Sequence, residues 1–428
     1  MTPRAQTWAA PTAIDPVAAV VPLPGSKSMT ARAMVLAAVS FGASTLVRPL
    51  RARDTELMSV GLRAMGVTIS TVDDEHLVVR PRPLTGPAHV DVALAGTVMR
   101  FLPPLAALAT GPVTFDGDPR ARRRPLAPLV AALRSLGVRV DGSESDGLPL
   151  TVYGQGRVRG GEVSLDASPS SQLISGLLLA APDFDRGLTV RHVGPPMPSG
   201  PHLRMTVQML RGAGAAVDDS TPHVWRVEPA RLRGRGWQIE PDMSTAAPFL
   251  AAALVTGGSV TVPRWPRTTL QNGELLREVL TRMGGRVTLS ERGLTVRGTG
   301  VVHGIDVDLH DQGELSPVVA ALAAVADSPS TLRGVAHIRG HETDRIAALA
   351  RELSALGAGV SEYADGLTIE PRPMKGTVFE TYDDHRMAHA AAVVGLAVPG
   401  IILSDVACTA KTLPDFAALW STMVGANS

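Results

Sequence analysis

One pattern recurs six times along the chain and constrains its fold more than any other feature. In each copy an amphipathic helix ends at a glycine, and in five copies a short strand follows at once. The glycines are spaced 68 to 77 residues apart: Gly66, Gly137, Gly214, Gly284, Gly357 and Gly425. Glycine just past a helix end adopts a left-handed conformation that other residues resist. Helix, glycine and strand occur together in many α/β proteins, but this even spacing favours a true repeat of six small α/β units, each with its own sheet.

The two ends of the chain each look incomplete. The sixth helix, Phe416 to Val424, has no strands after it, and the strand-like run Trp8 to Leu23 has no helix before it. The simplest interpretation is that the two ends complete one unit together. We therefore expect residues 25–239, units one to three, to form an inserted domain. Residues 1–24 and 240–428 would form the second domain, with the chain crossing near Pro24 and again near Glu240.

Composition excludes several classes of protein. The net charge of +1 and the aromatic content of 4% argue against a nucleic-acid partner. The N-terminus has no unbroken apolar segment typical of a signal peptide, and no apolar run approaches the roughly 20 residues that span a bilayer. We expect a cytoplasmic protein. The single cysteine, Cys408, is more typical of a small buried residue than of a nucleophile.

The stretch from Leu23 to Arg32 has the strongest functional signal. Pro24 and Gly25 end a strand-like run, and Ser26 or Ser28 can cap a helix expected over residues 30–39. Lys27 and Arg32 then lie in the first turns of that helix, where cations are unfavourable unless an anion is bound. Lys27 is also one of three lysines among 41 basic residues. The alternative, a solvated basic helix start, stays open for this stretch alone. The order Ser26–Lys27 does not match a Walker A loop.

Other polar motifs precede apolar helices in the remaining units. Their residues are Gly96 and Arg100, the arginines at 120, 122, 123 and 124, Ser170, Ser171 and Gln172, Ser199 and His202, Glu314, then His341, Glu342 and Arg345, Asp383 to Arg386, and Lys411. Each motif alone could be an ordinary cap or a solvated face. Together they place cations at helix starts in five units, and we expect them to converge where the two domains meet. Such a site suits small phosphorylated carboxylates. No histidine pair has metal spacing, so we expect neither a metal nor another cofactor.

These motifs resemble those of the 3-phosphoshikimate 1-carboxyvinyltransferase (EPSP synthase) family, and the resemblance covers essentially the whole chain. The matching segments are Pro24–Ser28 with Arg32, Ala95–Arg100, Gly117–Arg120 with Arg124–Pro125, Ser170–Gln172, Glu342–Arg345, Asp384–Met387 and Cys408–Thr412. The resemblance implies a two-domain inside-out α/β barrel in which each domain has three βαβαββ units. It also implies transfer of the enolpyruvyl group of phosphoenolpyruvate to the 5-hydroxyl of shikimate 3-phosphate, with release of phosphate. The enzyme would be a monomer that uses no cofactor and no metal.

The resemblance also implies roles for individual residues. Those that would bind shikimate 3-phosphate are Lys27, Ser28, Arg32, Ser170, Ser171, Gln172, Ser199, Glu314 and His341. Those that would bind phosphoenolpyruvate are Lys27, Gly96, Arg120, Gln172, Arg345, Arg386 and Lys411. Proton transfer would involve Glu314 as the base that contacts the hydroxyl, with Glu342, Lys27 and His385. Room beside Gly96 predicts inhibition by glyphosate, competitive with phosphoenolpyruvate.

Some positions depart from the common family pattern. Leu94 and Ala31 replace asparagines and Phe101 replaces a proline, while His202, His337 and His341 stand where Tyr, Asn and Lys are common. His341 should make substrate binding pH-sensitive, because a neutral imidazole is a weaker anion ligand than lysine. Two alternatives remain. One is the sister transferase that acts on UDP-N-acetylglucosamine, which uses a loop cysteine that this chain lacks. The other is a non-catalytic anion-binding protein, which would be expected to lose Lys27, Glu314, Glu342 and Lys411.

Overall fold

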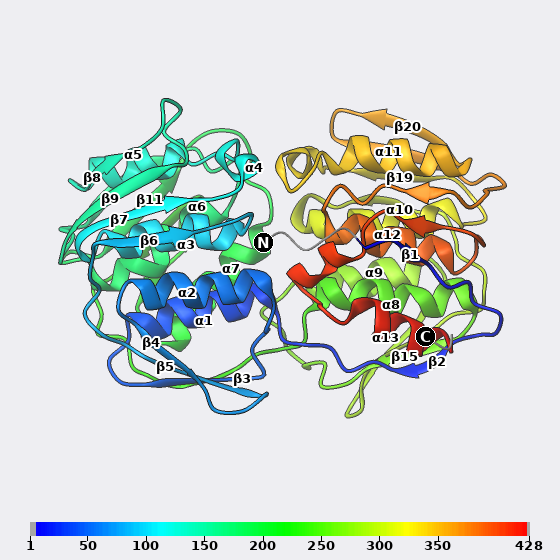
Figure 1. Cartoon of the computed structure of the whole chain (residues 1–428), viewed down its shortest axis with the longest axis horizontal. Helices are drawn as coiled ribbons and strands as arrows, with labels where there is room; N and C mark the ends of the chain where they lie inside the picture. The colour runs from blue at the N-terminus through cyan, green and yellow to red at the C-terminus, as the bar shows by residue number, and fades with distance from the viewer. Residues whose placement is uncertain (1–5, 426–428) are drawn as a thin grey trace. The chain divides into compact units, whose positions relative to one another are not determined.

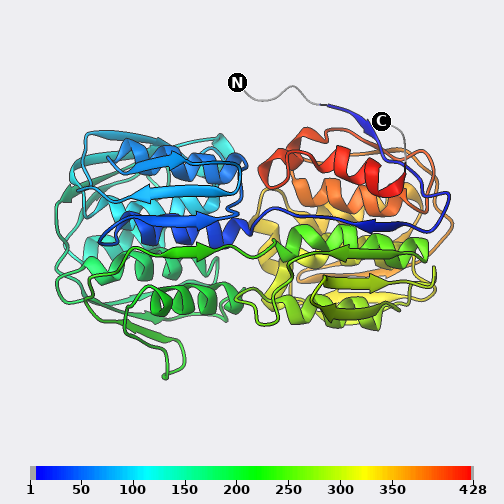
Figure 2. The same ribbon diagram turned by 90° about the horizontal axis from the view of Figure 1, so that it is seen from below.

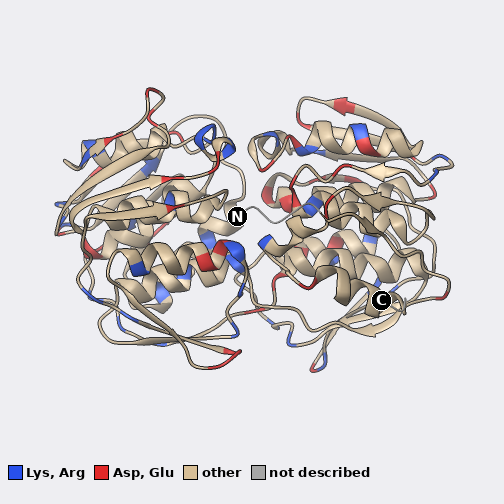
Figure 3. Ribbon diagram, in the orientation of Figure 1, with Lys and Arg blue, Asp and Glu red and all other residues tan. Residues whose placement is uncertain are grey.

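A computed structural model describes residues 6–425 of the chain, which folds as two compact units of mixed α/β structure. The inserted unit runs from Gly25 to Ile239, and the terminal unit is built from the chain up to Pro24 and from Glu240 onward. Figure 1 shows the elements of each. No helix among the described residues is long and apolar enough to cross a membrane. Basic and acidic residues are interspersed over each unit in Figure 3, so neither unit is uniformly basic.

Three four-stranded sheets of the inserted unit share one strand order, in which the first pair is parallel and the other two are antiparallel. They are β14 (Gly236–Gln238), β3 (Ser44–Val47), β5 (His76–Arg80) and β4 (Thr68–Thr71); then β6 (Ala88–Asp91), β7 (Thr110–Asp116), β9 (Leu150–Gln155) and β8 (Arg139–Asp141); then β10 (Gly161–Leu165), β11 (Leu188–His192), β13 (Val224–Val227) and β12 (Val217–Asp218).

The same order recurs in the terminal unit. Two complete sheets are β2 (Ala18–Val20), β15 (Ser259–Val262), β17 (Gly293–Arg297) and β16 (Arg286–Ser290); and β18 (Asp306–Asp308), β19 (Ser330–Arg333), β21 (Gly366–Glu370) and β20 (Gly359–Tyr363). The last sheet has three strands among the described residues: β22 (Val378–Phe379), β23 (Ile402–Leu403) and β1 (Trp8–Ala9).

The N-terminal run contributes to two sheets, where the sequence predicted a single unit. Its first strand, β1, pairs antiparallel with β23 beside the last helix of the chain. Its second strand, β2, pairs parallel with β15 of a different sheet, and the two lie side by side in Figures 1 and 2. Pro11 and Pro16 interrupt the run and divide it into two short strands.

Each unit is centred on three apolar helices whose residues are almost all buried. In the inserted unit these are α1 (Lys27–Ala38), α3 (Gly96–Ala106) and α6 (Gln172–Ala180), and in the terminal unit α8 (Met243–Thr256), α10 (Ser316–Ala324) and α12 (His385–Gly395). The other α-helices are α2 (Arg53–Ala64), α4 (Pro119–Arg122), α5 (Ala127–Ser135), α7 (Gly200–Gly212), α9 (Gly273–Arg282), α11 (Arg345–Leu356) and α13 (Phe416–Val424). Short 3-10 helices are η1 (Ala181–Asp183), η2 (His310–Leu315), η3 (Ala336–Gly340) and η4 (Ala407–Lys411). A helix that is apolar all round belongs in a core, which explains this arrangement.

The predicted left-handed glycines are confirmed. All six glycines that end the repeated helices have φ between 75° and 117°. The helix expected over residues 30–39 begins earlier than predicted, however. The first helix begins at Lys27 rather than Thr30, because Ser26 caps it by accepting a hydrogen bond from the Met29 amide. Apolar periodicity appears one turn after the true start, since the first turn carries polar residues.

Lys411 was also misplaced. It ends the 3-10 helix η4, and α13 begins only at Phe416. Pro414 follows within this gap and disfavours helical backbone in the residue before it. The side chain of Lys411 is therefore positioned by a tight turn rather than by the first turn of α13.

The left-handed glycines predict a matched pair of stability effects. Gly214→Ala should reduce the free energy of unfolding by about 1 kcal/mol, because φ at this position is 101° and no neighbour lies within 4 Å of the new Cβ. Gly236→Ala in β14 also meets open space but has no positive φ, so it should change stability little. Urea denaturation measures both variants. Equal destabilisation would contradict the backbone explanation.

Candidate active site

The buried side chain of Arg345 organises the polar residues of the terminal unit. Its Nε and Nη2 donate to the two carboxylate oxygens of Asp384 at 2.8 and 3.1 Å, and Nη2 also donates to Glu342 at 2.8 Å. Asp384 has no exposed surface and caps α12 by accepting from the Arg386 amide. Burial alone would lower the pKa of Arg345, but Asp384 and then Glu342 raise it above its ordinary value. The guanidinium is therefore a fixed positive charge.

Glu342 joins this network to Lys411. One of its carboxylate oxygens accepts from Arg345, and the other pairs with the Lys411 ammonium, which is 1% exposed. The sequence left open a capping role for Glu342. The cap of α11 is instead Asp344, which accepts from the Ala347 amide, so Glu342 can hold two cations.

Arg386 is a buried cation of a different kind. It donates a hydrogen bond to the Ser244 carbonyl at 3.5 Å and forms no ion pair with any residue between 6 and 425. Burial lowers the pKa of its guanidinium, and the positive charge of Arg345 lowers it further. An arginine in such surroundings is stabilised when an anion binds.

Glu314 lies half-buried in η2, in the electrostatic field of Arg345, Arg386 and His337. His337 packs against the backbone of Gly313, where a Cβ would come within 2.5 Å of its Nε2. Burial lowers the pKa of His337, and the charge of Glu314 partly opposes that effect. The imidazole next to the carboxylate is therefore neutral at pH 7.

His341 follows in the same row of imidazoles. Its ring centroid is 5.9 Å from that of His337, and its Nδ1 lies 3.0 Å from Nη1 of Arg345. A guanidinium can only donate, so Nδ1 accepts and the proton of a neutral ring is on Nε2. In this structure His341 supports Arg345 in addition to any contact with substrate.

His385 is placed inside the fold at the first turn of α12. It is 2% exposed, its Nδ1 is 3.6 Å from Asp384, and its ring meets that of His389 edge-on at 5.7 Å. His389 is fully buried against Phe416 at a centroid distance of 4.6 Å, and neither ring nitrogen has a hydrogen-bond partner among the described residues. Burial, with smaller effects from Arg386 and Arg345, lowers the pKa of His389 to about 3.

In the inserted unit, Lys27 begins α1 at the capped turn described above. Its Nζ is 3.4 Å from the buried carboxylate of Asp54 in α2, and its side chain keeps 20% exposure. The ammonium is thus held at the helix N-terminus while one side stays accessible. The expectation of a cation in the first turn of this helix is confirmed.

Arg32 ties the starts of three helices together from inside. Its Nε donates to Thr206 at 2.7 Å, and its two terminal nitrogens donate to the carbonyls of Ser28 and His202 at 3.0 Å. The side chain is 1% exposed and has no carboxylate partner among the described residues. Burial lowers its pKa from 12.5 to about 9. The geometry makes Arg32 a positioning residue and a source of positive potential rather than a surface contact.

The start of α6 and the turn before α7 lie side by side. Ser171 donates its hydroxyl to the Ser199 carbonyl at 3.5 Å, and the Ser170 hydroxyl accepts from the Gln172 amide at 3.3 Å. Ser199 has a φ of 57°, a left-handed conformation that is strained for serine. The side-chain oxygen of Gln172 accepts from Arg100 of α3 at 3.1 Å. Arg32 reaches the same group through Ser175 of α6 at 3.5 Å.

The arginine loop directs Arg120 and Arg124 to different neighbours. The Arg120 guanidinium donates to Asp118, two residues before it, at 3.1 and 3.2 Å, and its side chain is 34% exposed. Arg124 instead lies next to Gly96, where a Cβ would be 3.0 Å from its Nη2, and it donates to the Leu94 carbonyl at 3.1 Å. The room predicted beside Gly96 is thus bordered by Arg124 and Arg100.

Within each unit the structure collects most of the predicted residues. The terminal unit joins His341, Glu342, Arg345, Asp384 and Lys411 by direct contacts. The inserted unit joins Ser28, Arg32, Ser171, Gln172 and Ser199 through Arg32 and its neighbours. Thr206 was missed, because its partner Arg32 lies far away in the sequence and leaves no local signal. Asp384 and Arg124 lay in predicted motifs, but no specific partner was predictable for either from the sequence.

Cys408 agrees with the expected structural role. It is 5% exposed, burial raises its pKa, and its Sγ donates to the Asp405 carbonyl at 3.2 Å. A thiol that stays protonated is a poor nucleophile.

Comparison with known proteins identifies one family. The sequence model of EPSP synthase (3-phosphoshikimate 1-carboxyvinyltransferase) matches residues 11–420. A solved structure of EPSP synthase from Acinetobacter baumannii is similar in fold, with a TM-score of 0.82 and 24% identity over 98% of each chain. A second structure of EPSP synthase from that organism gives a TM-score of 0.81 and 23% identity, again over 98% of each chain.

The Asp384–Arg345 pair predicts a large effect on stability. Asp384→Asn leaves the Arg345 charge buried with one partner fewer, so the free energy of unfolding should fall by about 3–5 kcal/mol. Asp219→Asn, which removes the partner of Arg211 at the surface, should cost less than about 1 kcal/mol. Denaturant unfolding at one pH compares the two. Similar losses of unfolding free energy in the two variants would show that the buried ion pair contributes no more to stability than the surface pair.

His389 predicts a loss of stability in acid. Its pKa is about 3 when folded and about 6.5 when unfolded, so below pH 6.5 the unfolded state binds the extra proton. Protonation of His389 in the unfolded state should therefore lower the free energy of unfolding by about 2 kcal/mol between pH 7 and pH 5. His389→Leu should lower the pH dependence of the unfolding free energy by that amount. An unchanged pH dependence would contradict the assignment.

Proposed function

The chain belongs to the EPSP synthase (3-phosphoshikimate 1-carboxyvinyltransferase) family, and we propose which residues perform its reaction. The enzyme transfers the enolpyruvyl group of phosphoenolpyruvate to the 5-hydroxyl of shikimate 3-phosphate and releases phosphate, a step of the shikimate pathway to aromatic compounds. The assignment of residues rests above all on one observation. Each unit buries an arginine, Arg32 or Arg386, without a carboxylate partner among the described residues.

The charges of the substrates fit this observation. Two phosphates, at about −1.5 to −2 each, and two carboxylates bring roughly five negative charges. Neither Arg32 nor Arg386 forms an ion pair with a carboxylate of the described residues, and burial makes each cation costly in the free protein. Glu314, Asp242 and Asp384 offset the charge of Arg386 only in part. Binding of the substrate anions offsets that cost.

We assign the binding of shikimate 3-phosphate mainly to the inserted unit. Lys27 and Ser28 offer an ammonium and a hydroxyl at the start of α1. At the start of α6, Ser170 and Ser171 offer hydroxyls and Gln172 offers an amide. Ser199 holds the turn before α7, while Arg32 fixes these three helix starts and supplies positive potential. Helix N-termini with hydroxyl donors suit a phosphate group. Glu314 and His341 of the terminal unit complete this set.

We assign phosphoenolpyruvate to a second set of cations. Lys411, Arg345 and Arg386 of the terminal unit act with Lys27, Gly96 and Gln172 of the inserted unit. The arginine loop contributes Arg120, which the resemblance implies, and we add Arg124 to the set. Arg124 lies beside Gly96, and its Nε is buried with no hydrogen-bond partner among the described residues.

The chemistry follows as addition and then elimination. Glu314 accepts the proton of the 5-hydroxyl while the hydroxyl oxygen bonds to C2 of phosphoenolpyruvate. Glu342 or Lys27 protonates the methylene carbon. The resulting tetrahedral intermediate loses that methyl proton and the phosphate, which restores the double bond. Because Glu342 contacts both Arg345 and Lys411, its proton can be exchanged beside the bound phosphate. We place His385 as a support for Asp384.

We also propose that the protein works as a cytoplasmic monomer on small molecules. It would require no metal, other cofactor, nucleic acid or membrane. The basis is the donor set itself: positioning, charge neutralisation and proton transfer by side chains account for each step of the reaction.

Acceptor-dependent phosphate release tests the assignment. Purified protein without added metal should release phosphate from phosphoenolpyruvate when shikimate 3-phosphate is present, and UDP-N-acetylglucosamine should not replace it. Lys27→Ala should reduce kcat at least 100-fold, because it removes both a charge and a proton donor. Arg82→Ala, an exposed arginine of the same unit, serves as control. Full activity of Lys27→Ala would overturn its role, and activity with the nucleotide sugar alone would favour the sister enzyme.

A substitution at Gly96 should weaken the binding of both the inhibitor and phosphoenolpyruvate. Glyphosate should inhibit competitively with phosphoenolpyruvate, and Gly96→Ala should weaken that inhibition about tenfold or more. The new Cβ would lie 3.0 Å from both Arg100 and Arg124, so KM for phosphoenolpyruvate should rise as well. Gly236→Ala, which meets open space, is the control. Steady-state inhibition measurements decide, and unchanged inhibition in Gly96→Ala would overturn the placement.

A further inference from the structure

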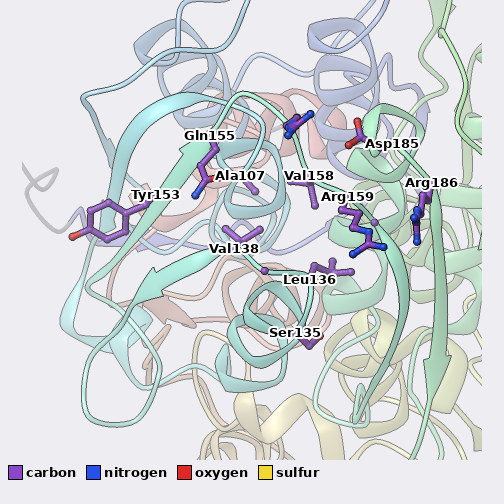
Figure 4. A pocket seen from close by; sticks show the side chains of 13 residues that line it. Ala107, Ser135, Leu136, Val138, Tyr153, Gln155, Val158, Arg159, Asp185 and Arg186 are labelled. Carbon is purple, nitrogen blue, oxygen red and sulfur yellow. The ribbon is translucent and has the colours of Figure 1, made fainter.

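A polar cavity lies in the inserted unit, at the carboxyl ends of α3 and α5. It has a volume of about 710 Å3 and is bordered by Ala107 after α3, by Ser135 at the end of α5, and by the segments around Arg157 and Arg186 (Figure 4). This volume is within the range of small-molecule sites, roughly 300–1,000 Å3. None of the residues assigned above to substrate lines it.

Three arginines give the cavity its charge. Arg157, Arg159 and Arg186 line it, all three are exposed, and none forms an ion pair with a residue in the described part of the chain. Asp185 is the one carboxylate in the lining. The net charge of the lining is therefore 3 − 1 = +2, which matches one phosphate group at about −1.5 to −2.

The backbone holds two of these like charges together. The Arg186 amide donates to the Arg159 carbonyl at 3.0 Å, and the Asp185 amide donates to the Val158 carbonyl at 2.9 Å. Figure 4 shows the guanidinium groups of Arg159 and Arg186 on the same side of the cavity. Solvent and Asp185 reduce the repulsion between these exposed like charges, and an anion placed between them would be attracted by both.

The other walls suit a small organic body. Leu136, Val138 and Val158 are apolar, and Gln155 adds an amide. The α5 helix ends here, so its partial negative charge disfavours an anion at the helix itself. The arginine side chains, not helix backbone, must supply the binding.

We propose that this cavity binds a small phosphate monoester, with its phosphate on Arg159, Arg186 and Arg157 and its organic part on the apolar wall. The site is separate from the substrate residues. Gly96 begins α3 and the cavity lies past its last residue, Ala106, which is about 15 Å away at 1.5 Å per residue.

Binding of phenyl phosphate tests the proposal, with isothermal titration calorimetry on the whole protein. The double variant Arg159→Ser/Arg186→Ser should weaken the binding to this cavity at least tenfold. The control Arg82→Ser/Arg233→Ser removes the same charge from exposed arginines of the same unit that do not line the cavity. It should bind as the wild type does. Far-UV circular dichroism and the thermal midpoint should be unchanged in both variants, which shows that each is folded.

Each outcome decides the matter. Weakening confined to the cavity variant supports the site. Equal weakening in both variants would mean a general effect of surface charge, and no binding by the wild type at about 1 mM would mean that the cavity is no phosphate site. Phenyl phosphate bound at the substrate residues gives the same heat in all three proteins. The result does not depend on turnover, so failure of the proposed function would leave it intact.

Discussion

The terminal unit depends on the buried carboxylate of Asp384. It caps α12, ion-pairs with the first residue of α11 and, through Arg345 and Glu342, holds Lys411 at the end of η4. Three segments far apart in the sequence are thus fixed by one side chain with no exposed surface. An ion pair in such surroundings is strong because water does not compete for either partner. Positions of the cations therefore follow from the fold and need no substrate to define them.

The inserted unit buries positive charge in another way. Arg32 has neutral acceptors, two carbonyls and two hydroxyls, and burial lowers its pKa. These acceptors orient the guanidinium but leave its charge uncompensated. The terminal unit therefore has a preformed network of paired charges, and the inserted unit has a charge that an anionic ligand can neutralise. In the terminal unit Arg386 is also buried without an ion pair among the described residues, although Glu314, Asp242 and Asp384 partly offset its charge.

Local constraints were predictable from the sequence, and contacts across the fold were not. Gly66 and its five counterparts require positive φ, a property of one residue and its neighbours, so their positions revealed the repeat. The helix start at Lys27 was placed late because its first turn is polar. Arg124 lies beside Gly96 while Arg120 pairs with Asp118, and four arginines close together in a loop look alike until the loop is folded.

The pairing of the N-terminal strands has a consequence for synthesis of the chain. β2 needs β15, some 240 residues later, and β1 needs β23 near the end. At about 5–20 residues per second, the ribosome makes the whole inserted unit while both strands wait without partners. That unit, whose last strand β14 pairs with its first, β3, is complete before the terminal unit can close. The strands β1 and β2 are therefore made before the inserted unit but find their partners after it.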